Sequence, residues 1–136
     1  MNEILRTARA LGIAAVVVTT SVTFLECNPE TVMPYAPVVK DTLDYFEYSV
    51  PVNGVTTTSR YFWETTGTVA SVNLMSTVTA GTATVTIVDD NAAVIFSHAL
   101  DGSGVVGTGT GDAGFWNIMV TLTNAKGTLH FTVVPQ

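Results

Sequence analysis

The stretch FWNIMVTLTNAKGTLHFTV, residues 115–133, decides the fold class of this 136-residue chain. Its apolar side chains recur at every second position: Trp116, Ile118, Val120, Leu122, and then Leu129, Phe131 and Val133. A period of two places such a set on one face of a β-strand. Between the two sets, Asn124–Gly127 contains residues typical of tight turns. The stretch therefore predicts two strands that meet as a hairpin across residues 124–127.

Similar alternating runs fill the chain from residue 41 onward. The predicted strands are Leu43–Val52, Val55–Glu64, Thr68–Val78, Thr82–Asp89, Ala93–Leu100, Gly104–Thr108, Phe115–Thr123 and Thr128–Val134. The side chains expected to face inward include Val85, Ile87, Val94, Phe96 and Leu100, with His98 on the same face as the last three. Asn53-Gly54, Ala80-Gly81 and Asp101-Gly102 favour positive φ and hence tight turns. Eight short strands at this spacing predict an all-β fold, a single antiparallel β-sandwich.

The N-terminal part of the chain has a different character. Arg6 and Arg9 precede ALGIAAVVVTTSVTFL, residues 10–25, which carries no charge. A basic segment followed by an apolar run is the organisation of an export signal. We expect residues 1–27 to form an export signal or membrane anchor with a hydrophobic helix, residues 28–40 a Pro-rich spacer, and residues 41–136 the β-domain. The expected location is periplasmic, outer-membrane or cell-surface.

The end of this leader leaves three outcomes open. An apolar run that stops just before Cys27 resembles a bacterial lipoprotein signal, in which the cysteine is lipidated. Phe24 and Glu26 depart from that pattern, which has an aliphatic residue three positions before the cysteine and a small residue directly before it. Simple cleavage near Thr19–Ser21 is the second outcome, and a retained anchor with its arginines on the cytoplasmic side is the third.

Composition excludes several functions. Hydrophobic residues make up 47% of the chain and charged residues only 12%, which argues against disorder. After the leader the only cations are Lys40, Arg60 and Lys126, too few for the basic footprint that nucleic-acid binding needs. With Cys27 as the single cysteine, the chain forms no internal disulfide and no zinc site built on paired cysteines.

Three blocks in the second half carry a family resemblance. They are VTIVDDNAAVIF (residues 85–96), the Gly-rich GSGVVGTGTGDAG (residues 102–114) and the stretch at residues 115–133 quoted above. Their order resembles the bacterial pre-peptidase C-terminal domain and similar jelly-roll-like sandwiches of exported proteins. The resemblance implies a non-catalytic accessory or adhesive domain. It transfers no functional residues.

Candidate site residues fall into three groups. Tyr48, Tyr61 and Trp63 belong to an aromatic-rich pair of strands and are candidates for ligand binding, because exposed aromatic rings often bind sugars or proteins. Alternation sends Tyr61 and Trp63 to one face and Phe62 to the other, so one of these faces belongs to the core.

The second group is Asp89, Asp90 and Asn91, whose oxygens are candidate calcium ligands, although Asp-Asp-Asn is also a sound turn. Calcium is the one cofactor considered. The third group is His98 and His130. A catalytic role would need a nucleophile or a carboxylate held nearby, which a sequence does not show. His98 lies on the otherwise apolar face of its strand, so a hydrogen-bonded core or rim histidine is expected.

These observations predict an exported, non-catalytic β-sandwich that acts in surface interaction, adhesion or assembly. The expected partners are a membrane, through the leader or a lipid, and a protein or glycan. A chain with few charges to guard its strand edges is also suited to forming a homo-oligomer or a fibre. A small secreted hydrolase or a carbohydrate-binding module is the alternative.

Overall fold

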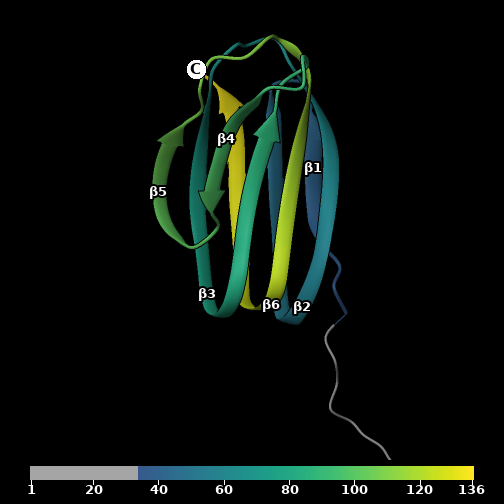
Figure 1. The fold of residues 1–136 in the computed structure, drawn as a ribbon, viewed down its shortest axis with the longest axis vertical. Helices are drawn as coiled ribbons and strands as arrows, with labels where there is room; N and C mark the ends of the chain where they lie inside the picture. The colour runs from purple at the N-terminus through teal and green to yellow at the C-terminus, as the bar shows by residue number, and fades with distance from the viewer. Residues whose placement is uncertain (1–33) are drawn as a thin grey trace, which may run out of the picture. The chain divides into compact units, whose positions relative to one another are not determined.

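The computed structural model describes residues 34–136, which form an all-β domain, as predicted (Figure 1). All of its strands belong to one antiparallel sheet. Its strands are β1 (Val38–Thr42), β2 (Tyr45–Thr65), β3 (Ala70–Val88), β4 (Val94–Ala99), β5 (Gly102–Gly107) and β6 (Gly114–Pro135). The strand order is β1-β2-β6-β3-β4, and β5 also pairs with β3. The expected leader at residues 1–27, including Cys27 and its hydrophobic helix, lies outside the described residues.

The three long strands β2, β3 and β6 bend near their middles, at the lower end of the molecule in Figure 1. At each bend the strand passes from one layer of the domain into the other, and it stays paired with its neighbouring strand on both sides of the bend. Layer A consists of β1, residues 45–52 of β2, residues 125–135 of β6, residues 70–78 of β3, and β5. Layer B, in front in Figure 1, consists of residues 57–65 of β2, 114–123 of β6, 82–88 of β3, and β4.

The sequence predicted eight strands, but the described residues form six, because each of the long strands β2, β3 and β6 continues through a bend where the sequence predicted two separate strands. The predicted hairpins at Asn53-Gly54, Ala80-Gly81 and Asn124–Gly127 are wrong, because both halves of each strand pair with neighbouring strands and not with each other. The positive φ angles of Gly54 (72°), Gly81 (72°) and Gly127 (139°) serve bulges that turn the strand. Register shifts at these places in the β2–β6 and β3–β6 ladders mark the same bulges.

The core lies between the two layers and follows the predicted alternation in the last strand. Every member of both sets quoted from residues 115–133 is buried, as are Val85, Ile87, Phe96 and Leu100. Val94 is an exception, since 64% of it is exposed, and the prediction that it faces inward is wrong. The β3–β4 register shifts between Ile87 and Val88, at the start of β4. This shift breaks the alternation between Val94 and Phe96 and explains the change of face.

β1 shows that part of the expected spacer belongs to the sheet. Val38, Val39 and Lys40 pair with Ser49, Tyr48 and Glu47 of β2. Residues 34–136 include no helix long and apolar enough to cross a membrane.

Candidate interaction surfaces

The aromatic candidates from the sequence lie mainly in the core. Tyr48 and Trp63 have no exposed surface, so they are not available as surface contacts, and Tyr61 is half-buried against the same cluster. The Tyr48 ring lies 5.3 Å from the Phe131 ring and 5.9 Å from the Tyr61 ring, measured between centroids. Tyr48 and Trp63 are therefore core residues and not exposed ligand contacts.

The polar atoms of these buried rings have partners. The Tyr48 hydroxyl shares a 3.0 Å hydrogen bond with that of Tyr35, which also lies 2.8 Å from the Ser59 hydroxyl. The Trp63 indole N–H donates to the Thr42 carbonyl at 3.0 Å. Burial raises the pKa of Tyr48, because the phenolate would lose its hydration. These bonds fix the rings where they lie, since a buried polar group without a partner is costly.

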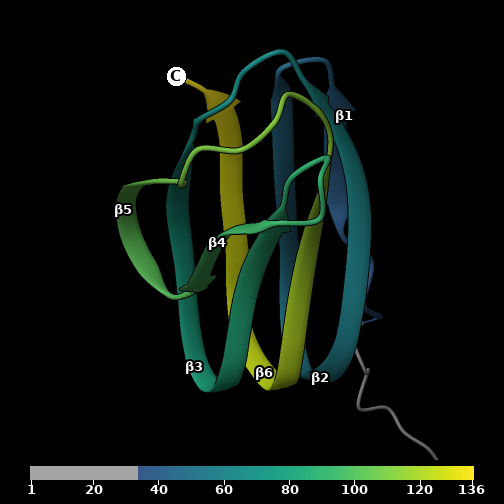
Figure 2. The same cartoon turned by 45° about the horizontal axis from the view of Figure 1, so that its top comes forward.

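Asp89, the first of the calcium candidates, bonds to the β3–β4 turn and to the β5–β6 connection. Both connections can be followed at the upper part of the domain (Figure 2). The Oδ1 atom of Asp89 accepts the backbone N–H groups of Asn91 at 3.0 Å and Ala93 at 2.8 Å. Its Oδ2 atom accepts the N–H of Asp112, in the β5–β6 connection, at 2.9 Å. These bonds, led by that from Ala93, lower the pKa of the Asp89 carboxyl. Asp89 thereby joins the β3–β4 turn to the Gly-rich segment.

The structure gives calcium no support at this cluster. The Asn91 side-chain amide donates to the Asp112 carboxylate at 2.8 Å, and the Trp116 indole donates to the Asp112 carbonyl at 2.7 Å. Asp90 is exposed. Between residues 34 and 136, no three His, Cys, Asp or Glu side chains are grouped so that they could hold a metal ion.

We expect Asp89→Asn to lower the melting temperature at pH 7, because the amide presents an N–H₂ group to one of three backbone donors. The lowered pKa means that the ionised carboxylate stabilises the fold above the unfolded-state pKa, about 3.9, and that this stability is lost as the pH falls through the folded-state value. Melting curves from pH 7 to pH 2.5 should therefore fall less steeply in the variant than in the wild type. Asp90→Asn is the matched control, and equal pH dependence in Asp89→Asn and wild type would contradict this role.

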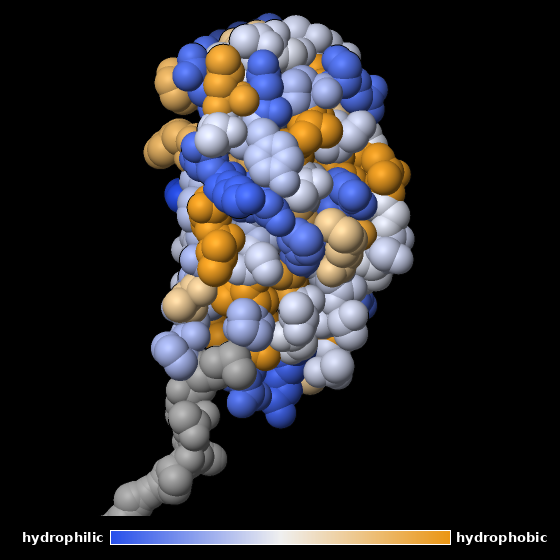
Figure 3. All heavy atoms as spheres, turned by 180° about the vertical axis from the view of Figure 1, so that it is seen from behind, coloured by the Kyte–Doolittle hydropathy of each residue, from blue (hydrophilic) through white to orange (hydrophobic). Residues whose placement is uncertain are grey.

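The outer face of layer A is mixed, with hydrophilic and apolar side chains interspersed across it (Figure 3). His130 Nε2 lies 2.9 Å from Glu47 Oε2, and the Tyr45 hydroxyl donates to Glu47 Oε1 at 3.0 Å. Lys40 Nζ lies 4.0 Å from the same oxygen. The hydrogen bond from His130, followed by that from Tyr45, lowers the pKa of Glu47. A concavity of about 290 Å³ beside this group is lined by Val38, Lys40, Glu47 and Ser49.

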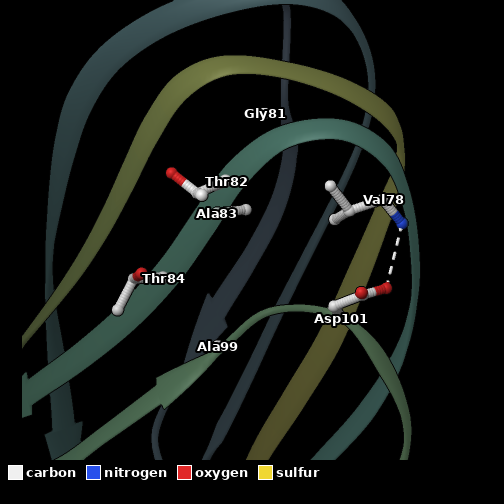
Figure 4. Close-up of a pocket in the computed structure, with 7 residues that line it drawn as sticks. All are labelled: Val78, Gly81, Thr82, Ala83, Thr84, Ala99 and Asp101. Atoms are coloured by element: carbon white, nitrogen blue, oxygen red, sulfur yellow. Dashed lines mark hydrogen bonds between the residues drawn. The ribbon is translucent and has the colours of Figure 1, made fainter.

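Two other features are structural. His98 Nδ1 lies 2.7 Å from the Ala99 carbonyl oxygen and its ring stacks on Phe96, so it fits the structural role expected for it. A cavity of about 210 Å³ lies beside the bend of β3 (Figure 4). Its one charged group, Asp101, accepts the backbone N–H of Val78 at 3.1 Å. That N–H lies just beyond Ser76, where the β3–β5 ladder ends, so the carboxylate takes the place of a ladder partner.

On the outer face of layer B, several large apolar side chains are exposed beside Arg60 and Glu64. Phe62 is 65% exposed, Phe115 55% and Val94 64%. Asn117 lies opposite Phe62 on one side and Val88 on the other, and Val88 lies opposite Val94. We call Phe62, Val88, Val94, Phe115 and Met119, which surround Asn117, the apolar face. The Oδ1 atom of Asn117 is buried and accepts no hydrogen bond from any described residue.

Sequence reasoning missed this face because alternation alone does not say which of two apolar sets faces the core. The alternation of side chains places Phe62 and Phe115 on the face opposite to Trp63 and Trp116, but it does not show that this face is exposed. The signal that could have found this face is an aromatic residue on the more polar side of each of two strand segments, Phe62 in one and Phe115 in the other. The two segments are neighbours in the sheet.

Comparison with known proteins finds no family model that matches the chain and no curated protein similar to it in sequence.

Proposed function

We propose that this chain is an exported, non-catalytic β-sandwich protein that acts in surface interaction, adhesion or assembly. The observation that carries the proposal is the apolar face, on which two phenylalanine rings and Val94 are more than half exposed. Exposed apolar side chains gathered on one face are typical of protein interaction sites, and aromatic residues dominate the binding energy at such sites.

The remaining parts of the proposal come from the sequence. The leader at residues 1–27 would deliver the domain across a membrane, by cleavage, by lipid on Cys27 or as a retained anchor. The likeness to pre-peptidase C-terminal and jelly-roll-like domains fits the same non-catalytic, accessory role.

The test uses bacteria that carry the full-length chain with a C-terminal tag. We expect protease added to intact cells to remove the tagged domain, and we expect these cells to adhere to one another in a settling assay. The double variant Phe62→Ser/Phe115→Ser should remain exposed to protease and lose adhesion, because it removes the two largest exposed rings of the apolar face.

Met75→Ser/Val105→Ser is the matched control. These residues are 44% and 67% exposed and lie on strands of layer A, so this variant should adhere like the wild type. A tagged domain that stays protected after the outer membrane is permeabilised would contradict export. Adhesion that is unchanged in the phenylalanine variant, or absent in the wild type, would contradict the interaction role.

The pair of Glu47 and His130 favours a small hydrolase as the second candidate. A carboxylate that orients an imidazole supplies two of the three members of a nucleophilic triad, and Ser49 pairs with His130 in the β2–β6 register. Within residues 34–136, however, no hydrogen bond joins the Ser49 hydroxyl to that imidazole; Ser76 bonds only to the His130 backbone. Turnover of p-nitrophenyl acetate that His130→Ala abolishes would favour this candidate, and no turnover would remove it.

A further inference from the structure

The outer face of layer B is open, although the edge of β2 beside it is closed. The Asp44 N–H, in the β1–β2 turn, donates to the Glu64 carbonyl at 3.1 Å, and the Asp44 carboxylate accepts the backbone N–H of Thr66 at 2.7 Å. This turn covers the upper part of the β2 edge against another strand. The side chains of Phe62 and Glu64 are nevertheless exposed, so a partner has access to the face and not to the edge.

The residues of this face form three rows across the sheet, because directly opposite residues of neighbouring strands point to the same side. The middle row consists of Phe62, Asn117, Val88 and Val94. On one side of it lies the row of Glu64 and Phe115, and on the other side lies the row of Arg60, Met119, Thr86 and Ser97. The apolar face thus occupies the middle row and β6, and the two charges lie at its β2 margin.

The two charges of this margin have opposite signs and lie at equal distances from Phe62. Arg60 precedes Phe62 by two residues and Glu64 follows it by two, and both side chains are exposed. Neither forms an ion pair with any residue between 34 and 136. A face with a cation at one end, an anion at the other and apolar side chains between them is complementary to a copy of itself turned end to end.

One twofold arrangement uses this complementarity. An axis that runs along the middle row, between two facing layers, keeps β2 over β2 and reverses the strand direction. Each Arg60 then lies opposite Glu64 of the other copy, the two Phe62 rings face each other, and Phe115 faces Met119, a favourable ring–sulfur contact. Facing sheets lie about 10 Å apart, a gap that long arginine and glutamate side chains bridge from the two sides.

Other twofold arrangements lose the match between the charges. An axis along the row of Arg60 or along the row of Glu64 places like charges opposite each other. An axis that runs parallel to β2 and directly above it does the same for both residues. An axis that places β2 over β4 leaves both charges opposite a strand that contains no Lys, Arg, Asp or Glu. The axis along the middle row is therefore the one that satisfies the apolar side chains and the charges together.

We propose that a second copy of this chain binds face to face on the apolar face, about a twofold axis along the row of Phe62 and Asn117. This rests on the proposed interaction role and names the partner. The contact is isologous, so it closes on itself and yields a dimer in place of an open fibre.

The experiment measures the dimer dissociation constant of the full-length chain by sedimentation equilibrium in mild detergent. Arg60→Glu and Glu64→Arg each turn both pairs of opposite charges in the dimer into pairs of like charges. Each variant alone should therefore raise the constant by about ten- to a hundredfold. Lys126→Glu, a charge reversal at an exposed position of the β6 bend, is the control and should leave the constant unchanged.

Mixing the two variants gives the sharpest comparison. In an equimolar mixture, the two acidic positions of one chain lie opposite the two basic positions of the other. A mixed dimer should therefore form with a constant within about threefold of that of the wild type. Misfolding would not be repaired by mixing, so this recovery separates a lost contact from a damaged domain.

Each outcome decides the proposal. A reversible wild-type dimer that each reversal weakens and the mixture restores supports the face-to-face contact. A dimer that the reversals leave unchanged, or that the mixture does not restore, overturns it. A wild-type chain that stays monomeric while cells still adhere through the apolar face overturns the second copy as partner and leaves the proposed function standing. Restored mixed dimers of a chain that is not exported would contradict the proposed function and leave the dimer standing.

Discussion

Replacing Trp63 by alanine should lower the free energy of unfolding by about 3–5 kcal/mol. The ring has no exposed surface and packs edge-on against Trp116 of the neighbouring strand, with 5.7 Å between centroids. The truncation empties a cavity in the core and also removes the indole hydrogen bond to the Thr42 carbonyl. Urea unfolding of the full-length chain, followed by far-ultraviolet circular dichroism, measures the change.

The neighbouring residue in the same strand provides the control. Phe62 is 65% exposed, so Phe62→Ala should change the stability by no more than about 0.5 kcal/mol. The two variants together separate the two faces of this part of β2. If Trp63→Ala is as stable as the wild type, the Trp63 ring does not lie in the core, and it is again a candidate ligand contact.

Gly127→Ala should destabilise the domain by about 2–6 kcal/mol, the sum of backbone strain and overpacking. Gly127 has a φ of 139°, where L side chains are strained. An added Cβ would also overlap the Thr77 carbonyl oxygen and lie 3.0 Å from the Val78 Cα atom. Because both neighbours belong to the backbone of the β3 bend, they cannot move aside without breaking the ladder. Chemical unfolding measures the loss.

Gly54→Ala is the matched control at the bend of β2. Gly54 also has a positive φ, 72°, but no atom lies within 4 Å of the position of its added Cβ. Only the left-handed backbone then opposes the substitution, at a cost of about 1–2 kcal/mol. Equal losses at the two glycines would mean that close packing between the bends of β3 and β6 does not hold the fold together.

At the candidate sites, the sequence identified the residue types, and the structure decided which of them are buried and which lie together. The sequence identified Asp89–Asn91 as a turn with carboxylates, and the structure adds the Asp112 amide that holds the loops together. Tyr48 and Trp63 were recognisable as aromatic residues but not as core. Phe62 and Phe115 become one surface only because β2 and β6 are neighbours, and the pairing of Glu47 with His130 joins residues 83 positions apart.

The sequence by itself determined the all-β class and the inward face of residues 115–133, because a period of two is a local property that every β-strand expresses. It also located the positive φ angles of Gly54, Gly81 and Gly102, because glycine adopts that backbone at no steric cost. Only the tertiary structure decided whether Gly54, Gly81 and Gly127 close hairpins or bend long strands. The same φ serves both, and the choice depends on whether a strand pairs with itself or with a neighbour far away in the chain, which no local pattern records.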